Sequence, residues 1–189
     1  SQPLAERLRP KTLDDYIGQK HLVGPGAVLR KMIDAGRVPS FILWGPPGVG
    51  KTTLAQIISN KLEAPFYTLS AISSGVKDVR DVIEKAKSNR FFNTVSPILF
   101  IDEIHRLNKV AEEILYPAME DYQIDVMIGK GATARSIRLE LPKFTLVGAT
   151  TRAGLLSAPL RDRFGVVNHL EYYTVKELET IIIRSANVL

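Results

Sequence analysis

Residues 41–53 constrain the fold more than any other stretch, because an apolar run, a glycine-rich turn and a helix-like segment follow one another there. The turn matches the pattern Gly-x-x-x-x-Gly-Lys-Ser/Thr at Gly45, Gly50, Lys51 and Thr52. The glycines, with Gly48, let backbone N–H groups turn inward around a phosphate, and the following helix points its positive end at the same anion. Lys51 is expected to contact the β and γ phosphates, and Thr52 to ligate Mg²⁺. A glycine turn that only joins a strand to a helix is the alternative.

A second apolar run, residues 98–101, ends in the acids Asp102 and Glu103. Carboxylates at the C-terminal end of a buried parallel strand lie where α/β sheets bind ligands. Asp102 is expected to hold Mg²⁺ through its water shell, and Glu103 to polarise the water that attacks the γ phosphate. Acids after a strand are also common at helix starts, so the pair indicates a Mg²⁺ and hydrolysis site only because a phosphate loop is present in the same chain. Three histidines have no metal-ligand spacing and are interpreted as surface or packing residues: His21, His105 and His169.

Residues 144–151 predict another buried strand, which ends in two hydroxyls. Thr150 or Thr151 could lie beside Lys51 and read the γ phosphate, although hydroxyls after strands cap helices as often. Farther along, Arg161 and Arg163 precede a last strand expected at residues 166–170. An arginine fork suits the phosphate of a neighbouring molecule, and an ion pair with Asp162 or Glu171 is the simpler alternative.

Residues 123–141 predict a β-hairpin, because apolar and polar residues alternate on both sides of a Gly-Lys-Gly turn at 129–131. Lys130, Arg135 and Arg138 make this arm basic. A hairpin that projects from a parallel sheet is either an addition without a function or a docking arm for a partner. Exposed apolar residues on one face would favour docking.

The length of 189 residues and the hydrophobic content of 45% suit a single α/β domain. We expect a three-layer αβα P-loop NTPase with a five-stranded parallel sheet and the inserted hairpin. The absence of cysteine excludes disulfides and thiolate metal sites. No apolar run approaches membrane-spanning length, and we expect a cytoplasmic protein without membrane contact. The net charge of +5 permits nucleic-acid binding but does not demand it, because the charges are scattered.

With these motifs assembled, the whole chain resembles the large domain of an AAA+ ATPase. From residue 4 to about 108, the stretches Pro-Leu-Ala-Glu-Arg-Leu-Arg-Pro, His-Leu-Val-Gly-Pro-Gly and Ile-Leu-Trp-Gly-Pro-Pro-Gly resemble the RarA (MgsA) family of replication-associated recombination ATPases. From about 106 to 189, Ile-Gly-Lys-Gly and Gly-Ala-Thr-Thr-Arg-Ala-Gly-Leu-Leu-Ser-Ala-Pro-Leu-Arg-Asp-Arg-Phe-Gly resemble the RuvB family of Holliday-junction branch-migration motors. The two resemblances meet at residues 102–108 and favour an engineered chimera, with a natural divergent member as the alternative.

The resemblance implies a role for each matching residue. ATP or ADP would be bound by the adenine-pocket positions Leu8, Arg9, Tyr16 and Ile17, by the phosphate contacts Gly45, Gly48, Gly50, Lys51, Thr52 and Thr53, and by Glu120, Asp121, Tyr122 and Tyr173. Thr52 and Asp102 would hold Mg²⁺. The catalytic set would be Lys51, Glu103 as the water-activating acid, Thr150 as a sensor, and Arg163 as a finger inserted into a neighbour's site. By their apolar character alone, Leu8, Tyr16 and Ile17 could equally pack the first segment against the body.

The resemblance also suggests domains and partners. Residues 1–20 would form the adenine-pocket segment, 21–173 the AAA+ large domain with the hairpin 123–141, and 174–189 the first helix toward a lid domain expected to be absent. Both families work as ring oligomers on DNA, and the hairpin resembles the RuvB arm that docks on RuvA. The chain itself is expected to be truncated and monomeric or weakly associating. The predicted function is the Mg-ATP-hydrolysing core of a DNA recombination motor, and a folded chimeric scaffold with little or no ATPase activity is the alternative.

Overall fold

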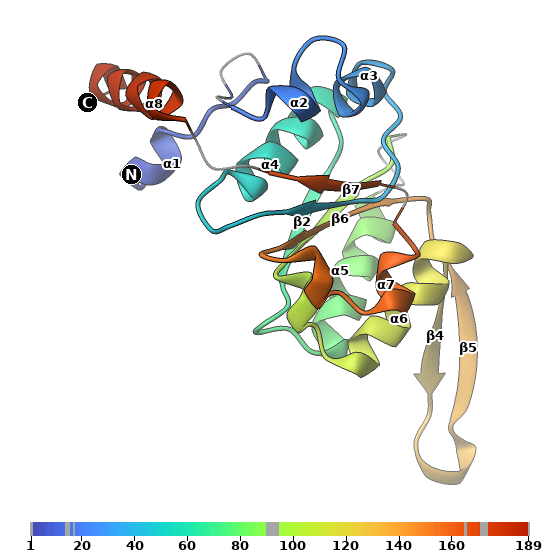
Figure 1. Cartoon of the computed structure of the whole chain (residues 1–189). Helices are drawn as coiled ribbons and strands as arrows, with labels where there is room; N and C mark the ends of the chain where they lie inside the picture. The colour runs from blue at the N-terminus through green and yellow to red at the C-terminus, as the bar shows by residue number, and fades with distance from the viewer. Residues whose placement is uncertain are drawn as a thin grey trace.

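A computed structural model describes residues 2–13, 16, 18–89, 95–164, 166–170 and 174–188 of the chain. Its main sheet has parallel strands in the order β2-β3-β6-β1-β7. These are β1 (Phe41–Trp44), β2 (Phe66–Ser70), β3 (Ile98–Asp102), β6 (Thr145–Thr150) and β7 (Val166–His169). Helices cover both faces of the sheet (Figure 1). The expected α/β class with a parallel sheet is therefore confirmed. Two expected nucleotide contacts, Ile17 and Tyr173, lie outside the described residues.

The helices are α1 (Leu4–Arg7), α2 (Lys20–Val23), α3 (Val28–Asp34), α4 (Lys51–Leu62), α5 (Val76–Asn89), α6 (Lys109–Glu120), α7 (Ala158–Arg161) and α8 (Val175–Val188), with short 3₁₀ turns η2 (Ile104–Arg106), η3 (Gly131–Thr133) and η4 (Ala153–Leu155). Helices α3 and α4 lie on one face of the sheet and α5 and α6 on the other, whereas α8 extends away from it (Figure 1). Apolar side chains of α3 and α4 pack into one buried cluster, and those of α5 and α6 into another. The three layers follow because α3 and α4 on one side, and α5 and α6 on the other, each bury an apolar stripe against the sheet.

The strands are apolar at consecutive positions because both of their faces are covered. In β1, Phe41 and Leu43 belong to the α4 cluster, whereas Ile42 belongs to the α5 and α6 cluster. The same alternation places Phe100 of β3 on the α4 side and Ile101 on the other. All five side chains are at most 1% exposed. The sheet is thus a rigid platform whose strand ends hold the loops that follow them.

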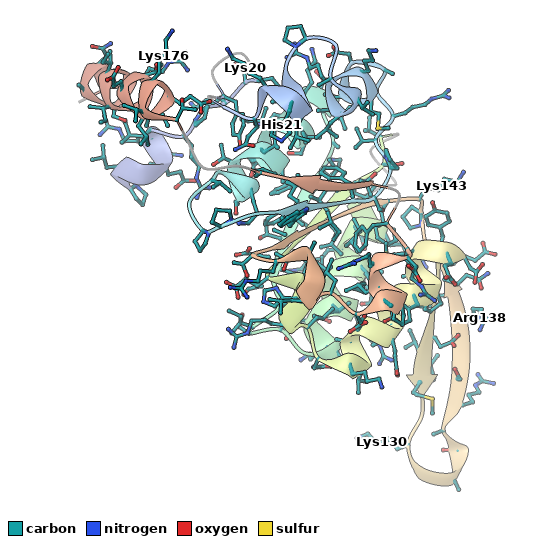
Figure 2. All side chains as sticks on the ribbon, in the orientation of Figure 1. Lys20, His21, Lys130, Arg138, Lys143 and Lys176 are labelled. Atoms are coloured by element: carbon teal, nitrogen blue, oxygen red, sulfur yellow. The ribbon has the colours of Figure 1, made fainter. Side chains whose placement is uncertain are left out.

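The predicted hairpin forms from β4 (Gln123–Ile128) and β5 (Arg135–Glu140), which pair in antiparallel register. Its turn is longer than the Gly-Lys-Gly pattern suggested, because η3 follows before β5 begins. The arm projects away from the sheet, and Figure 2 shows Lys130 near its tip, Arg138 along it and Lys143 toward its base. Met127 and Ile128 are 59% and 46% exposed on this arm. The hairpin therefore carries both basic and apolar surface.

The last helix begins with a reciprocal cap. The Thr174 backbone N–H donates to Glu177 Oε1 at 2.8 Å, and the Glu177 backbone N–H donates to Thr174 Oγ1 at 3.2 Å. This is the capping box that the Thr-x-x-Glu spacing predicts. None of the helices in the described ranges is long and apolar enough to cross a membrane.

Candidate functional site

Three strands of the main sheet end side by side and carry the loops with the predicted site residues. Trp44 at the end of β1 is paired with Thr150 at the end of β6, and Ile101 of β3 is paired with Gly148 of β6. Because the strands are parallel, the phosphate loop, the acids after β3 and the hydroxyls after β6 meet at the same sheet edge. Carboxyl ends of parallel strands are where α/β folds bind ligands.

A cavity of about 430 Å³ opens at this edge. It is lined by Arg9, Pro47, Gly48, Gly50, Lys51, Thr52, Thr53, Asp102, Glu103, Thr150 and Thr151. The structure therefore brings together the predicted phosphate loop, both acids and both candidate threonines, although these groups are spread over residues 47–151 of the chain. Sequence reasoning had not included Pro47. Leu8 is half-buried at the end of α1 and does not line this cavity.

The phosphate loop has the backbone that an inward-facing cradle of N–H groups requires. Gly48 and Gly50 have φ values of +79° and +90°, a region in which other residues are strained. Gly45 is needed for a different reason, because a Cβ there would lie 2.4 Å from the carbonyl oxygen of Leu170. Gly50 is the residue before α4, so the N-terminus of that helix faces the cavity.

Lys51 lies across the loop that precedes it. Its Nζ donates to the carbonyl oxygens of Gly45 at 2.7 Å and Pro46 at 3.0 Å. Burial lowers the pKa of Lys51 from its ordinary value, and the charges of Asp102 and Glu103 partly oppose that change. An ammonium that is partly desolvated and held only by neutral carbonyls gains from an anion in the same cavity.

Tyr16 fastens the first segment onto the loop. It is buried, and its hydroxyl lies 3.3 Å from the carbonyl oxygen of Val49 and 3.2 Å from that of Gly50, so it shares one proton between them. This contact supports the loop backbone directly. It also brings the segment that contains Arg9 to the cavity, which Arg9 lines.

The two acids differ in their local geometry. Asp102 accepts a hydrogen bond from the backbone N–H of Glu103 at 3.0 Å and is exposed at the end of β3. Glu103 has φ 50° and ψ 47°, a left-handed conformation that costs a non-glycine residue about 1–2 kcal/mol. Its Oε2 lies 3.9 Å from Arg106 Nη1. Strained residues of this kind cluster at functional sites, which agrees with the place of Glu103 in the cavity.

The donor set suits Mg²⁺ held together with a phosphate ligand. Within the described ranges, no three His, Cys, Asp or Glu side chains gather closely enough to hold a metal by themselves. The cavity instead offers one hydroxyl, from Thr52, and the Asp102 carboxylate, with space beside them. Mg²⁺ prefers one or two protein oxygens plus phosphate oxygens and waters to a complete protein cage.

His105 was interpreted from the sequence as a surface or packing residue, but it has a polar partner in the site. Its Nδ1 lies 2.7 Å from Thr150 Oγ1, and Thr150 is 1% exposed. The same hydroxyl lies 3.1 Å from the carbonyl oxygen of Arg152, so the histidine tautomer decides which group receives its proton. Burial lowers the pKa of His105, while Glu103 opposes the change. The sequence held no signal for this contact, which spans 45 positions.

Arg163 lies apart from the cavity of its own chain. Its Nε is 2.9 Å from Glu120 Oε1 at the end of α6, an ion pair whose N–H is not aligned for a hydrogen bond. The suggested pairing of this arginine with Asp162 is therefore wrong, and Glu171 lies outside the described residues. Asp121 follows α6, and the ring of Tyr122 packs edge-on against Phe144 at 6.2 Å. None of Glu120, Asp121 and Tyr122 lines the cavity.

Comparisons with known proteins agree with this geometry. The family described as the Holliday junction DNA helicase RuvB P-loop domain matches residues 8–170. The chain is 50% identical to the Holliday junction branch migration complex subunit RuvB of Fusobacterium nucleatum, over 98% of this chain and 55% of that protein. Its structure resembles that of the Thermotoga maritima RuvB Holliday junction branch migration motor with a TM-score of 0.77 at 41% identity, over 96% of this chain and 55% of the other. A P216G mutant of that protein gives a TM-score of 0.76 at the same identity, over 95% of this chain and 55% of the mutant chain.

The chain spans about half the length of these relatives. The match to the RuvB domain covers residues on both sides of 102–108, where a seam between two families was expected. The resemblance of the first half to RarA, and a chimeric origin, are not shown by these comparisons.

Proposed function

We propose a function from one established premise: the chain belongs to the family of the Holliday junction DNA helicase RuvB P-loop domain. This family is one of P-loop ATPases of the AAA+ type. We propose that the chain binds Mg-ATP and hydrolyses it as the ATPase part of a motor that acts on Holliday junctions. The observation that carries the proposal is the convergence of the phosphate loop, the Asp102–Glu103 pair and Thr150 around one cavity.

In this proposal the phosphate loop binds the triphosphate. The backbone N–H groups from Gly48 to Thr52 and the N-terminus of α4 surround the phosphates. Lys51 exchanges its two carbonyl contacts for the β and γ phosphate oxygens, and its partly buried charge gains a counter-ion. Thr53 and Arg9 line the cavity where they can contact the remaining phosphates and the base side of the nucleotide.

The reacting centre lies between the acids and Thr150. Mg²⁺, held through Thr52 and Asp102, would neutralise phosphate charge and polarise the γ phosphoryl group. Glu103 orients the attacking water and accepts its proton. It can do so because Glu103 lines the same cavity as the phosphate loop. Thr150 donates its hydroxyl proton to the γ phosphate, after giving up its contact with His105 or with the Arg152 carbonyl.

Completion of the site requires a second copy of the chain. Arg163 does not line its own cavity and lies on the α6 face of the sheet, so we propose that it reaches the nucleotide of a neighbour in a ring on DNA. Asp121 and Tyr122, which directly follow α6, are proposed as further nucleotide contacts, whereas the ion pair of Glu120 with Arg163 gives Glu120 the task of holding the arginine. We also propose that the hairpin docks on RuvA, with the exposed Ile128 as its apolar contact on the face that it shares with Val126; Met127 points to the opposite face.

The proposal is tested by measuring ATP binding in the presence of Mg²⁺, and then ATP turnover, for the wild-type chain and for the Lys51→Ala variant. We expect binding that is lost in Lys51→Ala, preference for ATP over GTP in competition, and turnover that rises steeply with protein concentration. A well-folded chain that binds no ATP would refute the proposal and favour the alternative of a chimeric scaffold without activity. Binding without turnover at any concentration would leave nucleotide recognition but remove the motor function.

A further inference from the structure

The guanidinium of Arg163 is fixed on three sides by its own chain. Its central carbon lies 3.9 Å from the centroid of the Tyr116 ring, which is cation–π distance. Nη1 donates to the carbonyl oxygen of Pro159 at 2.6 Å, and Nε is 2.9 Å from Glu120 Oε1. The arginine side chain is only 23% exposed. Such restriction is unusual for a long cationic side chain at a surface, and it removes most of the rotamer freedom of the arginine before any partner binds.

Tyr116 is itself held in place by Glu112, one turn earlier on α6. Its hydroxyl donates to Glu112 Oε1, and the same oxygen accepts a hydrogen bond from Ser157 Oγ. Ser157 caps α7, since its Oγ also accepts from the backbone N–H of Leu160 at 3.3 Å. Burial raises the pKa of Tyr116, so the hydroxyl keeps its proton through the neutral range. Glu112 thus ties α6 to the short helix that leads directly to Arg163.

The three contacts occupy Nε, Nη1 and one face of the guanidinium. Among the described residues, the structure gives no contact for the remaining nitrogen, Nη2. We propose that Tyr116 and Glu120 are positioning residues, which hold Arg163 so that Nη2 is presented to the γ phosphate bound by a neighbouring copy. This inference rests on the proposed function and adds to it the residues that prepare the finger. A cation that is already in place stabilises the negative charge that develops in the transition state, because its side chain does not have to reorient during the reaction.

The kcat values of two Tyr116 variants distinguish a positioning role from a merely structural one. Tyr116→Phe keeps the ring under Arg163 and loses only the hydroxyl contact with Glu112. Tyr116→Met keeps similar apolar volume and loses the aromatic face. If the ring positions Arg163, kcat falls in Tyr116→Met and is retained in Tyr116→Phe. If Tyr116 only packs α6 against α7, the two variants act through stability and leave kcat of the folded chain unchanged.

The experiment measures ATP turnover in mixtures of two variant chains. The Lys51→Ala chain cannot bind nucleotide but supplies Arg163, and the Arg163→Ala chain binds nucleotide but has no finger. Turnover regained on mixing therefore comes from sites that use the arginine of the Lys51→Ala chain. Tyr116→Phe, Tyr116→Met or Glu120→Gln is then added to the Lys51→Ala chain only, so that each change acts solely on the donated arginine.

We expect Tyr116→Met to lower the regained kcat about fivefold to tenfold, and Glu120→Gln a few-fold, without a change in KM. Tyr116→Phe should stay within about twofold of the Lys51→Ala donor. Equal activity of the Met and Phe donors would overturn the role of the ring, and a fully active Glu120→Gln donor would overturn that of Glu120. Glu120 is half exposed, so its variant reports on positioning even where a Tyr116 variant is poorly folded.

Failure of the premise gives a different result. A wild-type chain that turns over no ATP would refute the proposed function, and the positioning role with it. If the wild-type chain is active but the mixture of the Lys51→Ala and Arg163→Ala chains regains no turnover, Arg163 does not act between copies. Recovery that is indifferent to Tyr116 and Glu120 would refute the positioning role alone.

Discussion

Gly45→Ala should damage both the fold and the site, because Leu170, the residue after β7, leaves no room for a side chain there. A Cβ on Gly45 would lie 2.4 Å from the carbonyl oxygen of Leu170 and 3.2 Å from its carbonyl carbon, whereas ordinary contacts begin at 3.4 Å. The clashing atoms belong to the backbone and cannot rotate away. The ends of β1 and β7 must therefore separate by about 1 Å, which is the kind of overpacking that cores tolerate poorly.

The cost of that movement follows from the contacts around Gly45. The Leu170 backbone N–H donates to the Trp44 carbonyl at 2.7 Å, and the Gly45 backbone N–H donates to the Thr150 carbonyl at 3.1 Å. Overpacking of about 1–3 kcal/mol and the weakening of one hydrogen bond worth about 1 kcal/mol give a loss of about 2–4 kcal/mol in the free energy of unfolding. The Gly45 carbonyl also holds Lys51 Nζ, and a misplacement of about 1 Å can lower turnover about a hundredfold.

Urea denaturation measures the first effect, and ATP turnover measures the second. Gly154→Ala is the matched control, since a Cβ at Gly154 meets nothing within 4 Å and the substitution should change stability by less than about 0.5 kcal/mol. A Gly45→Ala chain as stable and as active as Gly154→Ala would refute the argument from close approach.

Three further predictions concern the acid, the lysine and a helix cap. Glu103→Gln removes the base and should lower single-turnover hydrolysis by about 10²–10⁴-fold while changing the ATP dissociation constant little; equal losses in both would contradict the role. ATP affinity needs the charged ammonium of Lys51, whose pKa is lowered from the ordinary 10.5. The affinity should therefore be full below the lowered pKa and be lost as the pH rises through it. Calorimetry across alkaline pH should show this loss in the wild type and not in Lys51→Arg. Asn108→Ala removes the side-chain oxygen that accepts from the Ala111 N–H at 2.8 Å and should destabilise the chain by about 1 kcal/mol in urea, whereas Asn108→Asp should keep most of the cap.

Features that depend on neighbours in sequence could be predicted from the chain alone. The Thr174 and Glu177 capping box is a contact across three positions, and both of its hydrogen bonds form. The alternation of residues 123–141 predicted the β4–β5 pair because a period of two fits only a strand with two different faces. The phosphate loop could be placed because its pattern combines a glycine requirement with a strand before it and a helix after it.

The order of the strands could not be derived in this way. Adjacent pairing of β1 with both β6 and β7 is a tertiary choice that no local pattern encodes. The hydroxyls at the end of a buried strand supplied the expectation that Thr150 or Thr151 lies beside Lys51, and resemblance to a family selected Thr150; the register of Trp44 with Thr150 supplies the physical basis. The contact of His105 with Thr150 depends on the register of β3 with β6 together with the turn after β3, and composition and spacing do not predict it.

The partner of Arg163 shows why nearest neighbours mislead for charged side chains. Asp162 is adjacent in sequence, but it ends α7, where successive side chains point to different sides of the helix. Glu120 is 43 positions away, yet α6 and α7 both pack on the same cluster, and this brings its carboxylate to 2.9 Å. The aromatic face of Tyr116 arrives by the same packing, one helical turn before Glu120. The residues that set the direction of Arg163 are therefore specified by the apolar stripe of α6, and substitutions that shift this stripe should change turnover between copies before they change nucleotide binding.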